Sequence, residues 1–313
     1  MPSVARRALA PPSHDSVTDF VERGYHLFPR AVSPAAAGQL LATVRSQRRF
    51  DESLFLSEAE FDANPTWRGV NPCPGRNLLD SFEPMLGFVE QDSQIVEALG
   101  ALLGEGYRIL NRKFVCGVPA TVIPQWLKDR ILGNPVNNLG PYVKPEFRDI
   151  TYFYGIDYHQ DLIDFPDRPA DMITLYVYLH PVTLRDAPLH LLEGSHALGA
   201  TVFPHDLRKL DDGAWRYGAG VRGAIDCPQL KLTGDAGFAA MWHGCTLHGT
   251  QPDDGDEERI SLRYLLTRGD DRPNGLDRVN AAIGWPVILP STTRADLDAQ
   301  GRARIKHNAV NKA

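Results

Sequence analysis

Hydrophobic side chains recur at helical spacing in three segments of the first hundred residues, which begin at Ser16, Ser33 and Ser93. Ser16, or Asp15 before it, and Ser33 can accept hydrogen bonds from the free N–H groups of a first helical turn. Residues 25–28 have the pattern of a short strand. We therefore expect a helical layer over about residues 14–105.

After Tyr107 the pattern changes to short runs of strand-forming residues between turn-forming residues. Strands are predicted at residues 108–116, 151–158, 172–180, 188–192, 229–232, 236–241 and 259–267. Many short strands favour a sandwich or barrel, and helices that precede them favour a helical layer packed on that core. We predict one α+β domain over residues 1–313, with a mainly β core at about 106–270 and a tail at 271–313.

The longest connection between predicted strands is residues 118–150. Connections of this length are usually lids, binding loops or insertions, and we expect a lid-like insertion. Together with Arg112 and Lys113, the segment carries six basic and three acidic side chains in a chain of net charge −6. It would suit an anionic substrate, such as one linked to CoA or to a carrier's phosphopantetheine, and a solvated loop of mixed charge is the alternative.

Composition excludes several classes of protein. The 33 basic against 39 acidic residues argue against a general nucleic-acid binder. No apolar run approaches the roughly 20 residues that span a bilayer. The cysteines at 73, 116, 227 and 245 have no paired spacing, so a zinc ribbon is excluded and reduced thiols are favoured. We expect a soluble, cytoplasmic protein with a small-molecule substrate and neither a nucleic-acid nor a membrane partner.

One His-X-Asp triplet, His159-Gln160-Asp161, could bind a metal ion. Residues i and i+2 of a strand point to the same face, so the imidazole and the carboxylate could share one ion. Such triplets also arise by chance. A second histidine would complete a facial triad of two histidines and one carboxylate, which is typical of non-haem Fe(II) oxygenases. The triad leaves three coordination positions, enough for a chelating 2-oxoacid and O₂.

Two histidines compete for the third ligand position, His243 and His248. Their odd separation would put them on opposite faces of a strand, so at most one would face the metal. His248 is favoured because Gly-Thr follows it and because Arg259 lies 11 residues later. We expect His243 to be a packed residue.

A bound 2-oxoacid needs a fixed cation for its far carboxylate, and the arginine fork suits this better than lysine. Arg259 begins the last predicted strand, Ser261 shares its face, and Thr250 can add a hydroxyl group. Arg263 shares that face too, and a structural salt bridge is the alternative role for it. We favour Arg259 as the anchor.

These motifs together resemble the phytanoyl-CoA dioxygenase (PhyH) family of Fe(II)/2-oxoglutarate-dependent oxygenases. The similar stretches are His159-Gln-Asp161-Leu, Phe165-Pro, Arg168-Pro, Asp171, Gly194-Ser-His196, His248-Gly-Thr with Arg259, and residues 19–28. The resemblance implies a double-stranded β-helix core of the jelly-roll or cupin type, with packed helices from the N-terminal part.

The resemblance also implies a ligand set. Iron would be held by His159, Asp161 and His248, and 2-oxoglutarate would be anchored by Arg259 with Thr250. Further candidates for contact with 2-oxoglutarate are Ser261, Lys113 and Asn111. No catalytic residue beyond the metal ligands is expected.

The implied reaction consumes 2-oxoglutarate and O₂, releases succinate and CO₂, and hydroxylates an unactivated C–H bond. Halogenation is disfavoured, because related halogenases replace the carboxylate that Asp161 provides. A composition rich in Ala and Arg suggests natural-product tailoring. The alternatives are an acyl-CoA 2-hydroxylase of the phytanoyl-CoA type and a catalytically silent β-helix protein that binds a metal or ligand. We expect residues 50–92 and 118–150 to form the walls that select the substrate.

Overall fold

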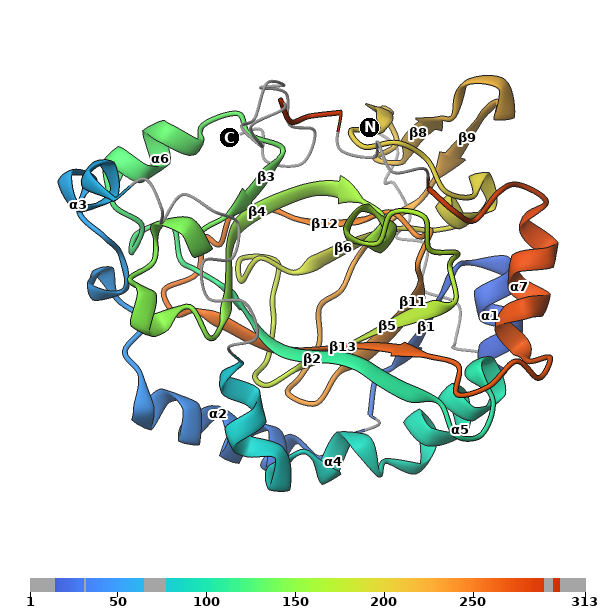
Figure 1. The fold of residues 1–313 in the computed structure, drawn as a ribbon, viewed down its shortest axis with the longest axis horizontal. Helices are drawn as coiled ribbons and strands as arrows, with labels where there is room; N and C mark the ends of the chain where they lie inside the picture. Colours follow the sequence, from blue (N-terminus) through green and yellow to red (C-terminus); the bar gives the residue numbers. More distant parts are fainter. Residues whose placement is uncertain (1–14, 31, 65–76, 290–294, 299–313) are drawn as a thin grey trace, which may run out of the picture.

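Ten strands of the described part of the chain form one sheet that curls over so that its two halves face each other (Figure 1). The computed structural model describes residues 15–30, 32–64, 77–289 and 295–298. The strands run in the order β1 (Tyr25–Phe28), β11 (Ala239–His243), β5 (Met172–Tyr178), β13 (Arg259–Thr267), β2 (Arg108–Gly117), β4 (Thr151–His159), β12 (His248–Thr250), β6 (Leu189–Leu192) and β10 (Gln229–Lys231), with β3 (Val136–Asn138) beside β4. This α+β arrangement confirms the predicted jelly-roll or cupin-like fold.

Alternation along the strands gives the sheet two chemically different faces. On β13, Ile260 and Leu262 belong to the large hydrophobic core, whereas Arg259 and Arg263 line a cavity inside the curled sheet. Strands β2 and β5 alternate in the same way. A period of two therefore places the polar side chains of three neighbouring strands inside the curl.

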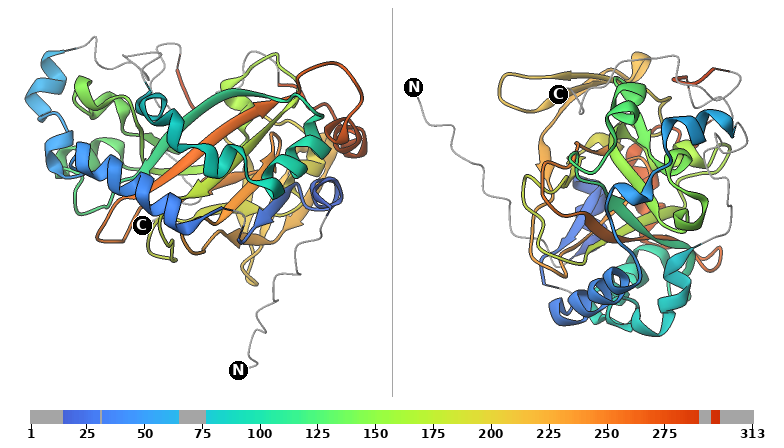
Figure 2. Two further views of the ribbon diagram at one scale, coloured as in Figure 1. Left: turned by 90° about the horizontal axis from the view of Figure 1, so that it is seen from below. Right: turned by 90° about the vertical axis from the view of Figure 1, so that its left-hand side faces the viewer.

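Helices cover the outer face of the larger half of the sheet (Figures 1 and 2). They are α1 (Ser16–Glu22), α2 (Pro34–Gln47), α4 (Gly87–Glu90), α5 (Ser93–Leu103) and α7 (Gly275–Ile283). The caps follow the sequence prediction, since Asp15 accepts from the backbone N–H of Val17 and Ser33 from that of Ala36.

The segment at residues 118–150 is a crossover between neighbouring strands. Strands β2 and β4 pair in parallel, with Val115 opposite Thr151. Parallel strands cannot be joined by a tight turn, so the chain must return to the starting end of the sheet. On the way it forms α6 (Gln125–Ile131) and β3.

The sequence pattern missed several short elements. Strands β7 (Asp206–Lys209), β8 (Trp215–Gly218) and β9 (Ala224–Cys227) form a separate three-stranded sheet, and α3 (Glu58–Ala63) and a 3₁₀ helix (Leu78–Met85) lie within residues 50–92. Strand β7 is mostly exposed, so it has no alternating apolar positions to reveal it.

The described part of the chain has no helix long and apolar enough to cross a membrane. Within that part, Cys116, Cys227 and Cys245 are buried and free, whereas Cys73 lies outside the described residues.

Candidate active site

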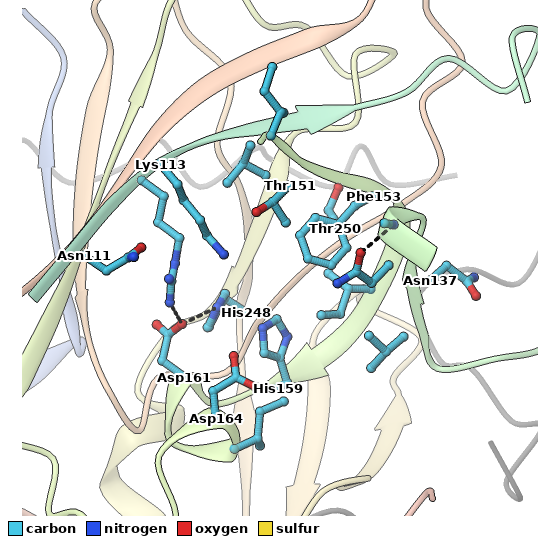
Figure 3. Close-up of a pocket in the computed structure, with 18 of the residues that line it drawn as sticks. Asn111, Lys113, Asn137, Thr151, Phe153, His159, Asp161, Asp164, His248 and Thr250 are labelled. Atoms are coloured by element: carbon cyan, nitrogen blue, oxygen red, sulfur yellow. Dashed lines mark hydrogen bonds and ion pairs between the residues drawn. The ribbon is translucent and has the colours of Figure 1, made fainter. Parts of the chain in front are cut away.

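Two histidines face each other across paired strands inside the curled sheet. His159 ends β4, His248 begins β12, and the strand register places them opposite each other. Their ring centroids are 4.1 Å apart. Asp161 joins them, and one potential ligand atom from each of the three residues lies within 4.8 Å of the other two (Figure 3). The three predicted metal ligands therefore converge on one buried point.

Asp161 does not share a strand face with His159, so the prediction from their spacing was wrong about the local structure. Strand β4 ends at His159, and Asp161 begins a 3₁₀ helix (Asp161–Asp164), so the two residues do not share a strand face. The chain turns at Gln160, whose side chain donates to the carbonyls of Gly199 and Cys245. This anchored turn, rather than strand alternation, brings the carboxylate back toward the imidazoles.

Both histidines are held in the tautomer that a metal ligand needs. The Nδ1 atom of His159 lies 3.0 Å from the carbonyl oxygen of Asp157, and that of His248 lies 3.1 Å from the carbonyl oxygen of Thr246. A carbonyl only accepts, so Nδ1 carries the proton and Nε2 keeps its lone pair. Burial lowers the pKa of both imidazoles, which keeps them neutral.

The carboxylate of Asp161 is fixed by three donors. Thr174 and the Trp242 indole donate to Oδ2 at 2.6 and 3.0 Å, and Arg263 donates to Oδ1 at 2.5 Å. Burial alone would raise the pKa of Asp161, but the charge of Arg263 and the hydrogen bond from Thr174 outweigh it and lower that pKa. The group is therefore an anion whose Oδ1 faces His248 Nε2 at 3.7 Å.

This donor set fits an iron(II) ion. Two neutral imidazoles and one oriented carboxylate form the facial triad of non-haem iron sites, and one side of the triad opens into the cavity. The hydrogen bonds behind each ligand supply the outer support that such sites need. His243 lies apart from this set, since its Nε2 is 2.9 Å from Asn280 Oδ1.

Arg259 is a fully buried cation at the start of β13, on the inner face of the sheet. Its Nη1 donates to the Tyr176 hydroxyl at 2.9 Å and to Ser261 Oγ at 3.4 Å. Its Nε has no partner among the described residues. Thr250 also lines the cavity, and its hydroxyl donates to the carbonyls of Ala187 and Gln251. Arg259 thus keeps donor capacity for an anion.

Gly117 makes room for Arg259. A Cβ at this position would lie 3.3 Å from both Nε and Nη2 of Arg259, and 3.5 Å from Oδ2 of Asp253. Asp253 is buried, and its Oδ2 has no partner in the described structure. Neither residue was predicted from the sequence, nor were Tyr176, Thr174 and Trp242, because none of them belongs to a recognisable motif.

We expect replacement of Asp253 by asparagine to change how stability depends on pH. Burial raises the pKa of Asp253 to about 6. The folded state therefore binds the proton more tightly than the unfolded state, whose aspartates titrate near 3.9. The favourable contribution of Asp253 to the free energy of unfolding is therefore complete below about pH 4 and is lost as the pH rises toward 6.

The asparagine side chain has no charge to bury. The difference between the midpoint temperatures of thermal unfolding, Asp253→Asn minus wild type, should therefore become more positive between pH 4 and pH 7. Thermal unfolding at several pH values measures this. A difference that is flat or becomes more negative contradicts the prediction.

A cavity of about 1040 Å³ opens from the three ligands. Lys113 and Asn111 of β2, two of the candidates for contact with 2-oxoglutarate, line it (Figure 3). The 118–150 segment contributes Ile131, Asn134–Asn138, Gly140–Tyr142 and Arg148–Ile150, and the 50–92 stretch contributes Phe61, Asn77 and Asp80. Phe82 lies in the hydrophobic core instead, and Trp67, Arg68 and Arg76, which were also expected at the walls, lie outside the described residues.

Comparison with solved structures finds similar folds. EvdO2 from Micromonospora carbonacea var. aurantiaca is 16% identical over 84% of this chain and 96% of its own, with a TM-score of 0.51. AviO1 from Streptomyces viridochromogenes Tue57 is 13% identical over 83% and 96%, with a TM-score of 0.44. SnoN, a non-haem α-ketoglutarate-dependent epimerase from nogalamycin biosynthesis, is 15% identical over 95% and 94%, with a TM-score of 0.47.

Comparison with curated protein sequences gives no match. The model of the family described as phytanoyl-CoA dioxygenase (PhyH) matches residues 123–261, a range that contains His159, Asp161, His248 and Arg259. Residues 123–261 are therefore similar to the phytanoyl-CoA dioxygenase family, and the chain is an iron(II)- and 2-oxoglutarate-dependent dioxygenase.

Proposed function

We propose that the enzyme hydroxylates an unactivated C–H bond of a small organic molecule, in the manner of a natural-product tailoring enzyme. The observation that carries this proposal is the convergence of two neutral imidazoles and one carboxylate at the inner end of the cavity. In the proposed assignment His159, Asp161 and His248 hold iron, and Arg259 holds the distal carboxylate of 2-oxoglutarate.

When bound, iron and 2-oxoglutarate would supply the oxidation together with O₂: one oxygen atom of O₂ would enter succinate as 2-oxoglutarate loses CO₂, and the other would be transferred to a substrate carbon. The side chains of the protein position the cosubstrate. Tyr176 and Ser261 orient the Arg259 fork, which would hold the distal carboxylate of 2-oxoglutarate. Trp242 and Leu189 also line the cavity and add apolar surface to it.

The outer cavity offers both apolar and amide contacts to a substrate. Phe153 and Ile156 of β4 form apolar wall, and Asn137 of β3 adds an amide. The side-chain oxygen of Asn137 is buried and has no partner within the described residues. Because an unsatisfied buried polar atom costs free energy, a substrate donor would bind favourably there.

The first test needs no knowledge of the substrate. Under anaerobic conditions, Fe(II) followed by 2-oxoglutarate should produce the weak visible charge-transfer band of their chelate. Turnover is then screened as 2-oxoglutarate-to-succinate conversion that depends on an added small molecule. A product heavier by one oxygen atom supports hydroxylation, whereas a product lighter by two hydrogens identifies desaturation instead. A folded protein that gives no band contradicts the proposal.

A further inference from the structure

Two hydrogen-bond acceptors of the cavity wall, Asn137 and Asp164, have no partner in the described structure. Asn137 is only 4% exposed, and its Oδ1 is buried without a donor among the described residues. Asp164 is exposed to the cavity, and no hydrogen bond or ion pair within the described part of the chain involves its carboxylate. Both groups are therefore open to a donor that enters the cavity.

Comparable acceptors of the same wall are satisfied by the protein itself. Asn138, the next residue of β3, accepts from the backbone N–H of Gly140 at 2.9 Å. Asp149 accepts from Arg48 at 2.6 Å. Buried acceptors are normally paired, because an unpaired one costs free energy. The donor for Asn137 therefore has to come from outside the described residues.

Asp164 lies next to the candidate metal ligands (Figure 3). It ends the 3₁₀ helix that begins at Asp161. Side chains three residues apart in a 3₁₀ helix lie on the same side, so the two carboxylates share one side of this helix. Asp164 is also close enough to His248 and Arg263 to interact with both electrostatically. A substrate group that binds Asp164 would therefore lie beside the metal site.

Asn137 would contact a different part of the same substrate. It pairs with Gly155, which precedes His159 by four residues along β4. At about 3.3 Å per residue, this is roughly 13 Å of strand. Between these positions Ile156 adds apolar surface to the wall. The wall thus offers an acceptor near the metal, an apolar stretch and a second acceptor.

We propose that the primary substrate is a hydroxyl-bearing molecule, with one hydroxyl group that donates to Asp164 beside the metal site and another that donates to Asn137. This inference rests on the proposed function and specifies its substrate class. It also separates that function from the acyl-CoA alternative, because a saturated acyl chain has no donor for either acceptor.

Hydroxyl groups suit these acceptors better than ammonium groups do. Lys113 and Arg263 both interact electrostatically with Asp164, so a further cation there would be repelled. The amide oxygen of Asn137 is neutral and buried, and it cannot balance a buried positive charge. A neutral donor meets neither obstacle.

The first measurement needs no ligand. Asn137→Leu replaces the unpaired acceptor by an apolar side chain of similar size, so it should raise the midpoint temperature of thermal unfolding by roughly 2 °C. The matched control is Asn138→Leu, which leaves the N–H of Gly140 without its acceptor and should lower the midpoint. A lower midpoint for Asn137→Leu would show that this amide serves the fold, and would overturn its assignment to a substrate.

The second measurement uses the full chain with Fe(II) and 2-oxoglutarate under anaerobic conditions, and binding is read as the perturbation of the visible band. The probes are phenyl β-glucoside, hexyl β-glucoside and 1,2-hexanediol, each with its per-O-methyl ether, which has no hydroxyl donor. Hexylammonium tests a charged donor. The variants are Asn137→Leu, Asp164→Leu and Asp164→Asn, which keeps an acceptor oxygen without the charge.

We expect at least one hydroxylated probe to bind wild type about tenfold or more tighter than its ether, as a hydrogen bond to a charged group provides. Asp164→Leu should abolish most of this preference, and Asp164→Asn and Asn137→Leu should each reduce it. The 2-oxoglutarate affinity, measured separately, should not fall in these variants, because none of them removes a positive charge.

Three results would overturn the inference: ethers that bind as tightly as the hydroxylated probes, no binding of any hydroxylated probe, or hexylammonium as the only probe that depends on Asp164. The last result would identify an amine substrate instead. Absence of the band in wild type is a separate failure, because it contradicts the proposed function itself.

Discussion

Replacing His248 by alanine is expected to lower the affinity for Fe(II) by more than about 100-fold, since loss of groups that only support ligands already costs 10–100-fold. The two remaining ligands, His159 and Asp161, cannot define a facial site. The Fe(II)–2-oxoglutarate band should disappear at metal concentrations that saturate wild type. Metal titration followed by visible spectroscopy measures both effects.

The matched control is His243→Ala. His243 is as deeply buried as His248, but it bonds to Asn280 and to the backbone N–H of Cys245 instead of facing the cluster. This variant should unfold more readily and still bind Fe(II) like wild type when folded. If His243→Ala loses the metal and His248→Ala keeps it, the assignment of the third ligand is wrong.

Replacing Arg259 by leucine is expected to weaken 2-oxoglutarate binding by roughly 2–5 kcal/mol, the usual cost of removing one partner of a buried charge pair. That is a loss of at least about 30-fold in affinity. Fe(II) binding should not change, because Arg259 does not touch the three ligands. Direct titration with 2-oxoglutarate in the presence of Fe(II), and with Fe(II) alone, separates the two affinities.

Two further variants show how the anchor works. Arg259→Lys keeps the charge without the planar fork and should recover only part of the affinity. Tyr176→Phe removes the hydroxyl that Nη1 contacts at 2.9 Å and should cause a smaller loss than Arg259→Leu. Unchanged 2-oxoglutarate affinity in Arg259→Leu would identify a cupin-like metalloenzyme that does not use Arg259 for a cosubstrate.

The sequence predicted a residue's role correctly where that role depends on residues close to it in the chain. The caps at Asp15 and Ser33 and the inward face of residues 259–267 follow from local rules, and the structure confirms them. The choice of His248 over His243 also agrees with the geometry, although the two residues belong to different strands rather than to one.

Contacts that depend on strand register could not be predicted. Thr174 and Trp242 meet Asp161 only because β11 and β5 pair with Trp242 opposite Thr174. Likewise, Asp253 approaches Arg259 through a loop whose path no periodicity reveals. Arg263 was considered for a structural salt bridge, and the structure shows that its partner is the candidate metal ligand itself.

The parallel pairing of β2 and β4 has a consequence for how enzymes with this architecture diversify. The crossover at residues 118–150 is anchored at both ends on adjacent strands whose register is set by the sheet. Its length and sequence can therefore drift without moving His159 on one strand or Lys113 on the other. Such a segment can be replaced to accommodate new substrates, while the residues that carry the oxidation stay in place.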